Sequence, residues 1–238
     1  MAMKKAIIIV VIVLVAVAAV AQWYFGDRGR FTTDAEFSGL DRVVSGNDLV
    51  SDYDPDSTLH FDPKFKYIGG QKFVLYGVAD TEQHFFVETT ADDKLKSLYW
   101  VQYEAYLPGK SQTYNYDDSP LRVMIGDYEF YTDTAVFEFD PNKKRARGTD
   151  GAMARQFLAS KGYQYPDQVA YARMVYLTDD SRQKELMIIY LDDLVSRGFT
   201  AAELEEGGAN AARWPEVEQA VLDRIRATLS MKGIQSFE

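Results

Sequence analysis

Hydrophobic residues first appear as one unbroken block near the start of the chain. Residues 6–21 carry no charge and no hydrogen-bonding side chain, and Lys4 and Lys5 precede them. With the next four residues the segment reaches about 20 residues, the length that a helix needs to cross a membrane. The segment is apolar on every side, which disfavours a helix at the surface of a water-soluble domain. The pattern therefore predicts a signal peptide or signal anchor over residues 1–25.

Two interpretations of this segment remain open. A small-x-small triplet that ends at Ala21 is typical of a signal-peptide cleavage site. If the helix is retained, Trp23 and Tyr24 would lie at the membrane interface, and Lys4 and Lys5 would hold the N-terminus inside. The long Ile/Val run favours the anchor. Both interpretations export the remainder, either as a single-pass protein of the inner (plasma) membrane or as a secreted, periplasmic protein.

Beyond the hydrophobic block the chain divides into two regions. Residues 26–70 are rich in Gly, Asp and Ser, and only short apolar clusters such as Val43-Val44 interrupt them. This composition predicts a tether or partly ordered linker with at most a short helix or edge strand. Residues 71–238 show sustained periodicity and are long enough for a single globular domain.

Apolar runs and alternating apolar and polar positions predict strands within the domain. Residues 95–107 alternate, with Lys96, Gln102 and Glu104 on the wetter side. A strand is also predicted at 185–191, and its residues 186–191 are apolar throughout and suit a sheet centre. Further strands are predicted at 73–79, 85–87, 121–125, 128–139 with a break near residue 133, and 169–177. The short connections between them favour antiparallel pairing.

Three segments show signals of helices. The first begins at residue 150 or 151 and runs to 161; a second covers 201–205, with Thr200 as its cap and Glu203 three residues later. The third starts near Pro215 and carries an apolar stripe to residue 229. The predicted class is α+β: a mostly antiparallel, curved sheet of about seven strands with a mid-chain helix and a long C-terminal helix.

Charge and composition exclude several functions. The net charge is −10, and two of the positive charges belong to Lys4 and Lys5, so the exported part is more acidic still. Such a surface repels phosphate backbones, and we expect no nucleic-acid partner. The chain has no cysteine, which removes thiolate nucleophiles, zinc–cysteine sites and iron–sulfur clusters. No glycine-rich cofactor loop is present, so no cofactor is predicted.

The two histidines and the one cluster of basic residues are expected to be ordinary structural or surface residues. His60 and His84 are the two histidines, and the HExxH motif is absent, so no metal site is predicted. Both histidines are expected at the surface or at a strand end. The basic cluster at residues 143–147 is expected to be an exposed loop, with contact to a polyanion as the alternative.

Two further motifs resemble functional signatures without completing them. Asp52, Asp54 and Asp56 are spaced like the start of a calcium loop, but Ser57 and Pro63 stand where that loop requires glycine and a carboxylate. A solvated acidic linker is the favoured interpretation. The S-x-x-K match at residues 181–184 lacks its companion motifs and falls in a predicted hairpin turn, and the Tyr-x-x-x-Lys match at residues 106–110 lacks a dinucleotide loop.

Carboxylates and aromatic rings provide the remaining candidate sites. Four glutamates on predicted strands are candidates for a carboxylate-dependent hydrolase of an envelope glycan: Glu88, Glu104, Glu129 and Glu138. Surface ion pairs are the more ordinary interpretation. The chain contains 16 Tyr, 14 Phe and 3 Trp, and strand alternation distributes aromatic rings over both sheet faces. The ligand-binding candidates among them are Tyr99, Trp100, Tyr103, Tyr106 and Tyr131.

The sequence therefore predicts a location more firmly than an activity. The leading hypothesis is a membrane-tethered, non-enzymatic domain of the cell envelope that binds another envelope protein or a small apolar ligand. The alternatives are a lipocalin-like carrier, whose aromatic strands would line a cavity, and the carboxylate-dependent hydrolase.

Overall fold

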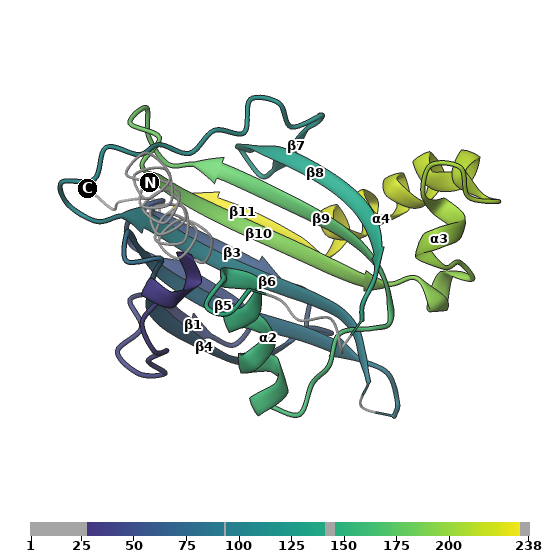
Figure 1. Cartoon of the computed structure of the whole chain (residues 1–238), viewed down its shortest axis with the longest axis horizontal. Helices are drawn as coiled ribbons and strands as arrows, with labels where there is room; N and C mark the ends of the chain where they lie inside the picture. The colour runs from purple at the N-terminus through teal and green to yellow at the C-terminus, as the bar shows by residue number, and fades with distance from the viewer. Residues whose placement is uncertain (1–27, 93, 141–145, 234–238) are drawn as a thin grey trace, which may run out of the picture.

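The computed structural model describes residues 28–92, 94–140 and 146–233 (Figure 1). The predicted membrane segment, with Lys4, Lys5, Trp23 and Tyr24, lies outside these ranges. Within them, no helix has both the length and the apolar character required to cross a bilayer.

Two antiparallel sheets form the framework, so the fold is α+β as predicted, although the strands divide between two sheets where one was expected. In spatial order the large sheet contains β4 (Lys66–Leu75), β5 (Ala79–Thr89), β6 (Leu95–Tyr106), β10 (Lys184–Asp193), β9 (Gln168–Leu177), β8 (Tyr128–Glu138) and β7 (Leu121–Ile125). The apolar run at 186–191 lies in β10, at the sheet centre as expected.

The small sheet is built mainly from residues that the sequence assigned to a linker. Its spatial order is β1 (Val43–Ser45), β2 (Asp48–Ser51), β3 (Ser57–Phe61) and β11 (Leu229–Gly233). The short apolar clusters of this region are enough for strands because Leu49, Leu59 and Phe61 are completely buried against the large sheet. The C-terminal strand β11, which the helical pattern up to residue 229 concealed, pairs with β3 and completes the sheet.

The large sheet buries side chains on both faces. Its inner face packs against the small sheet and against α4 (Trp214–Thr228), whose buried stripe includes Val221 and Ile225. Its outer face packs against α2 (Asp150–Ser160), where Phe157 stacks on Phe85 with 4.6 Å between ring centroids. Figure 1 shows α2 in front of the sheet and α4 behind it.

Most helices and strands lie where the local sequence patterns predicted them. Thr149 caps α2 by accepting a hydrogen bond from the Ala152 amide, and the Glu203 carboxylate accepts one from the Thr200 amide at the start of α3 (Ala201–Leu204). Three short 3-10 turns complete the described elements: η1 (Arg28–Phe31), η2 (Val195–Arg197) and η3 (Ala211–Arg213).

Two strand boundaries differ from the prediction. The expected strand at 73–79 spans the β4–β5 turn, because Tyr76 and Gly77 both adopt positive φ and reverse the chain. The expected break near Asp133 is absent. Residues 128–138 continue as one strand, and Asp133 pairs with Arg173 of β9 in register.

Replacing Gly126 with alanine should destabilise the contact between the two sheets. Gly126 lies in the β7–β8 turn with φ 60°, and an added Cβ would lie 2.0 Å from the carbonyl oxygen of Met231. Gly46 has the same φ of 60° but nothing within 4 Å of that position, so Gly46→Ala is a matched control for backbone strain alone. In urea unfolding we expect Gly126→Ala to lose about 2 kcal/mol more than Gly46→Ala. Equal losses would contradict the close approach of β11.

Candidate functional site

Next to the start of α2, the outer face of the large sheet carries buried polar side chains. Gln71, Gln83 and Gln102 follow one another across β4, β5 and β6, and each is at most 2% exposed. Each amide nitrogen donates to the next side-chain oxygen at 2.7, 2.7 and 2.8 Å, and the last acceptor is the Glu104 carboxylate. This chain of amides orients Glu104 and supplies one of its hydrogen bonds.

Glu104 faces a second carboxyl group directly across the sheet. In the pairing of β6 with β10, Glu104 is the register partner of Glu185. Side chains at such paired positions share a face and have Cβ atoms about 4.5–5.5 Å apart. Glu185 is 3% exposed, and Glu104 is half-buried beside it.

The loop between β6 and β7 places a tyrosine on each carboxyl group. The Tyr114 hydroxyl donates to Glu104 at 2.7 Å, and the Tyr116 hydroxyl donates to Glu185 at 2.7 Å. The loop is fixed by Arg182, whose carbonyl oxygen accepts from the Tyr114 amide at 2.8 Å and whose Nε donates to the Tyr114 carbonyl at 3.0 Å. The side chains that donate hydrogen bonds to this carboxyl pair are therefore neutral groups and not cations.

Burial shifts the ionisation of the pair toward neutral pH. It raises the pKa of Glu104 to about 7, against the lowering effect of the Tyr114 hydrogen bond. It raises the pKa of Glu185 to about 8, and the nearby Glu104 charge adds to that rise. Two adjacent carboxyl groups repel each other when both are ionised, so the pair retains a proton near pH 7.

The pair lies in an open pocket of about 570 Å³, here called the carboxyl pocket. Its walls are aromatic, with Phe31, Tyr76, Tyr106, Tyr114 and Tyr116 among the lining residues. Three of these rings form a row: the centroids of Tyr106 and Tyr114 are 4.6 Å apart, and those of Tyr114 and Tyr116 are 6.5 Å apart. The row continues to Tyr131, 6.4 Å from Tyr116.

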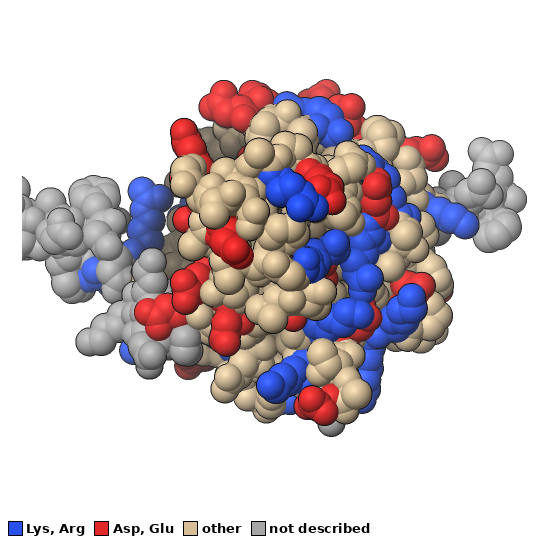
Figure 2. All heavy atoms as spheres, turned by 90° about the vertical axis from the view of Figure 1, so that its right-hand side faces the viewer, with Lys and Arg blue, Asp and Glu red and all other residues tan. Residues whose placement is uncertain are grey.

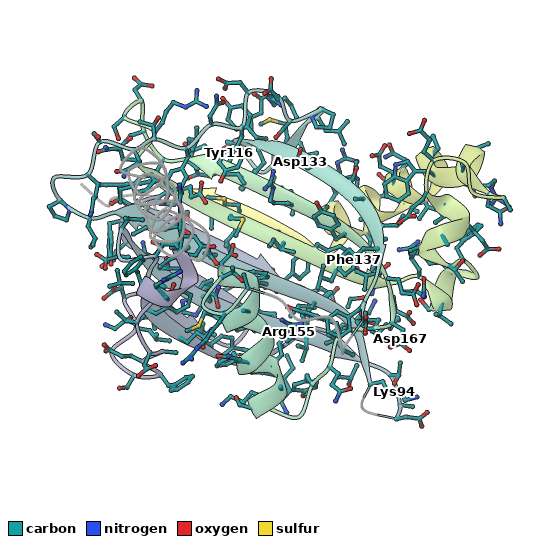
Figure 3. The ribbon with its side chains drawn as sticks, in the orientation of Figure 1. Lys94, Tyr116, Asp133, Phe137, Arg155 and Asp167 are labelled. Carbon is teal, nitrogen blue, oxygen red and sulfur yellow. The ribbon has the colours of Figure 1, made fainter. Side chains whose placement is uncertain are left out.

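Further charged groups border the pocket. Arg173 of β9 lies over the Tyr116 ring, but its guanidinium is engaged by Asp133 at 2.7 Å. Figure 3 shows Tyr116 and Asp133 near one another on this part of the sheet. Asp150, at the start of α2, also lines the pocket, and burial raises its pKa. Arg28 of η1 completes the charged lining.

The N-terminal end of the described chain forms one edge of the pocket. The Thr33 amide donates to the Val74 carbonyl at 3.0 Å, and Glu36 forms a bridge with Lys72, so this segment pairs with the edge of β4. Gly29 lies so close to Gly148 that an added Cβ would fall 1.6 Å from the neighbouring Arg147 oxygen. The backbone around Gly29 is thus held against the loop that precedes α2.

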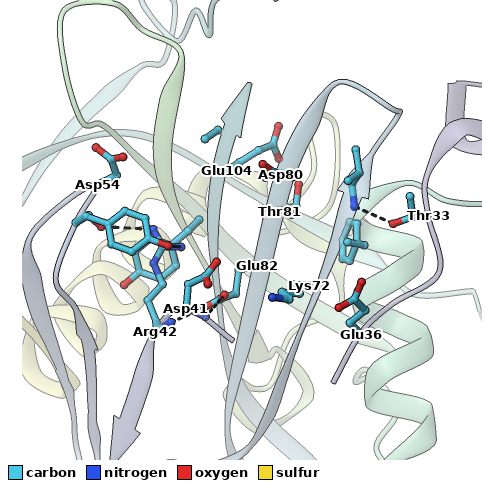
Figure 4. A pocket seen from close by; sticks show the side chains of 15 residues that line it. Thr33, Glu36, Asp41, Arg42, Asp54, Lys72, Asp80, Thr81, Glu82 and Glu104 are labelled. Carbon is cyan, nitrogen blue, oxygen red and sulfur yellow. Dashed lines mark hydrogen bonds between the residues drawn. The ribbon is translucent and has the colours of Figure 1, made fainter. Parts of the chain in front are cut away.

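A second pocket, of about 450 Å³, lies on the inner face near the same edge (Figure 4). Arg42 is sandwiched there between the rings of Tyr53 and Tyr103, 4.4 and 4.1 Å from their centroids. The Glu82 carboxylate accepts the amides of Asp41 and Arg42 at 2.7 and 2.9 Å. The Glu82 carboxylate thus fixes the protein's own backbone, which favours a structural role for this residue.

His84 corrects the expectation of a surface or strand-end histidine. It lies inside β5, is completely buried, and contacts the Tyr67 hydroxyl at 3.0 Å and the Glu82 carboxylate at 2.7 Å. His60 is exposed, as expected, and pairs with Asp48.

The aromatic candidates separate onto the two faces of the large sheet. Tyr99 and Tyr103 point to the inner face, where the Tyr99 hydroxyl contacts Thr228 at 2.7 Å. Trp100 is buried in the outer-face core near α2. Tyr106 lines the carboxyl pocket and Tyr131 ends the tyrosine row. The ligand-binding role of these residues remains a prediction.

Of the four candidate glutamates, Glu104 alone lines the carboxyl pocket. Glu88 forms ion pairs with Lys96 and Arg224, while Glu129 and Glu138 are exposed. Glu185 lies at the start of the strand predicted at 185–191 but was not among the candidates, because a single carboxylate in an apolar run gives no sign of its partner. A carboxylate at the same end of two apolar strands was the available signal, but their pairing register is not visible in the sequence.

The other motifs do not assemble into sites. Ser181 donates to Asp179, whereas Lys184 pairs with Asp54 at 2.7 Å, so the S-x-x-K residues face different partners. No group of three metal-ligating side chains occurs among the residues that the structure describes. On the end of the molecule that carries α3, basic and acidic side chains are interspersed (Figure 2).

No protein-family model, curated protein or solved structure matches this chain.

The stability of the fold should fall as the pH rises from 5 to 9. Both pocket glutamates have folded-state pKa values above the ordinary 4.5, so the unfolded chain loses these protons first and is favoured by rising pH. We expect the Tm of the full-length protein in detergent to drop by roughly 5 °C or more across this window. Glu104→Gln and Glu185→Gln should flatten the drop, whereas the exposed control Glu138→Gln should retain it. A wild-type Tm that is constant over this range would contradict the assignment.

Proposed function

We propose that this protein is an extracytoplasmic, membrane-tethered binding domain whose small ligand occupies the carboxyl pocket. The N-terminal hydrophobic segment supports the location. The pocket supports the activity, because its volume of about 570 Å³ falls within the range of small-molecule sites and its aromatic walls surround a few convergent polar groups.

The observation that carries this proposal is a contrast between the two ends of the β6–β10 pairing. At one end the buried Asp192 is compensated by Arg197, whose Nε lies 2.7 Å from the carboxylate. At the other end, Glu104 and Glu185 form no ion pair with any described residue. A buried carboxyl pair without a cation destabilises the folded state, and such groups concentrate at functional sites.

The lipocalin-like alternative is less favoured by this geometry. Such a carrier needs a closed apolar cavity inside a barrel. The large sheet is open, with β4 and β7 at its two edges in the described chain, and the carboxyl pocket has an open mouth and a polar floor.

The carboxylate-dependent hydrolase remains as a second candidate function. One observation favours it: the register places Glu104 and Glu185 directly opposite each other. Retaining glycosidases hold their two carboxyl groups about 5–5.5 Å apart, with one ionised and one protonated. The raised pKa values of this pair would allow that division near neutral pH.

A thermal-shift panel on the full-length protein would test the pocket. We expect a small sugar, amino acid or amine to raise the Tm of the wild type by about 5–10 °C at 100 times its Kd. Glu138→Gln should respond equally, and Glu104→Gln and Glu185→Gln should not respond. A ligand that stabilises all four proteins equally would place the site elsewhere. Consumption of the ligand by wild type alone, followed by NMR, would favour the hydrolase.

The N-terminus of the native protein, determined separately in the membrane, soluble exported and cytosolic fractions of its cells, would test the location. We expect either the uncleaved start, which indicates an anchor, or a start at Gln22, which indicates a removed signal peptide. Recovery of the uncleaved chain from the cytosol would contradict the proposed location.

A further inference from the structure

The chemistry of the carboxyl pocket narrows the class of ligand. Glu104 receives hydrogen bonds from Tyr114 and Gln102, and Glu185 receives one from Tyr116 through its Oε2 atom. All three donors are neutral. The Oε1 atom of Glu185 has no hydrogen-bond partner among the described residues, although the side chain is only 3% exposed and lines the pocket. This carboxyl oxygen is therefore left open toward the cavity.

The charges around the pair leave an excess of acidic groups. From α2, Asp150 adds a third carboxyl group to the lining. From β9, Arg173 contributes a cation, but Asp133 of β8 is within 2.7 Å of its guanidinium. From η1, Arg28 lies at the pocket edge. When the pair is ionised, a positively charged ligand group would compensate charges that the protein leaves uncompensated.

The pocket walls favour an organic cation over a metal ion. Aromatic faces attract a cation through their negative electron density, and ammonium groups are held in this way by tyrosine-lined sites. Tyr76 and Tyr106 line the pocket with such rings, whereas Tyr114 is stacked between Tyr106 and Tyr116, and Arg173 already lies over the Tyr116 ring. A hard metal ion would instead need several converging oxygen ligands, and no such group occurs among the described residues.

Building on the proposed function, we infer that the carboxyl pocket binds a small organic cation, an amine with an apolar substituent. Its ammonium group takes the place of the proton that Glu104 and Glu185 share in the free protein, and that proton passes to solvent. The apolar substituent lies against the tyrosine row. Binding is therefore coupled to proton release and strengthens as the pH rises through the range in which the pair ionises.

Three probes that share a phenyl ring and differ in their polar group test this inference: 2-phenylethylammonium, neutral 2-phenylethanol and anionic phenylacetate. Binding is measured by isothermal titration calorimetry on the full-length protein in detergent. At pH 8.5 we expect the amine to bind about tenfold or more tightly than the alcohol, and phenylacetate not to bind. Between pH 6 and 8 the affinity for the amine should rise by roughly tenfold or more, because at least one proton is released over this range.

Proton release is measured independently by repeating the titration at pH 7 in phosphate and in Tris, whose ionisation enthalpies differ. The apparent binding enthalpy should depend on the buffer by an amount that corresponds to nearly one proton. Glu104→Gln and Glu185→Gln should abolish both the preference for the amine and the proton release, whereas Glu138→Gln should preserve them.

The possible results test the organic-cation inference separately from the proposed ligand-binding function. Equal binding of amine and alcohol, or a preference for phenylacetate, would overturn the cation inference and leave the pocket as a ligand site. Failure of all three probes to bind, while the thermal-shift panel yields a pocket ligand that is not a cation, would do the same. If neither experiment yields a ligand that depends on the two glutamates, both proposals are overturned.

Discussion

The antiparallel pairing of β6 with β10 is the contact on which the rest of the structure depends. The strands β4, β5 and β6 form one continuous meander, while β7 to β10 form the other half of the sheet. These two strands alone join the halves within the large sheet, through partners as distant in sequence as Ser97 and Asp192. Ordering such a distant pair costs chain entropy, which burial of the apolar residues on both faces must offset.

The same pairing determines where the pocket lies. The middle of both strands is apolar, and α2 covers its outer face. Toward the Glu104–Glu185 end the covering changes from a helix to the loop that carries Tyr114 and Tyr116. Because a loop covers the sheet less completely than a helix, the change leaves a cavity floored by strands. Polar groups on rigid strands are held in a fixed geometry, which suits specific recognition.

Much of the fold was predictable because its strongest signals are local. The alternation at residues 95–107, the apolar run at 186–191 and the start of α2 each depend on neighbours in sequence, and all were placed correctly. The small sheet was missed because its strands are only three to five residues long and are stabilised by contacts with distant parts of the chain. The carboxyl pair could be predicted only in part: Glu104 was a candidate, but Glu185 becomes one only when the register is known.

The attachment of the N-terminal segment has a mechanical consequence. The chain enters the domain at Arg28 and Phe31, which line the pocket, and is then held by the contact of Gly29 with Gly148 and by the pairing of residues 33–36 with β4. Tension applied at this end would load the pocket rim before the remainder of the sheet, because the rim comes first along the chain. A pull that peeled residues 28–36 from the β4 edge would remove one wall of the cavity while leaving the β6–β10 pairing intact. A force on this end of the domain would therefore change the shape of the carboxyl pocket.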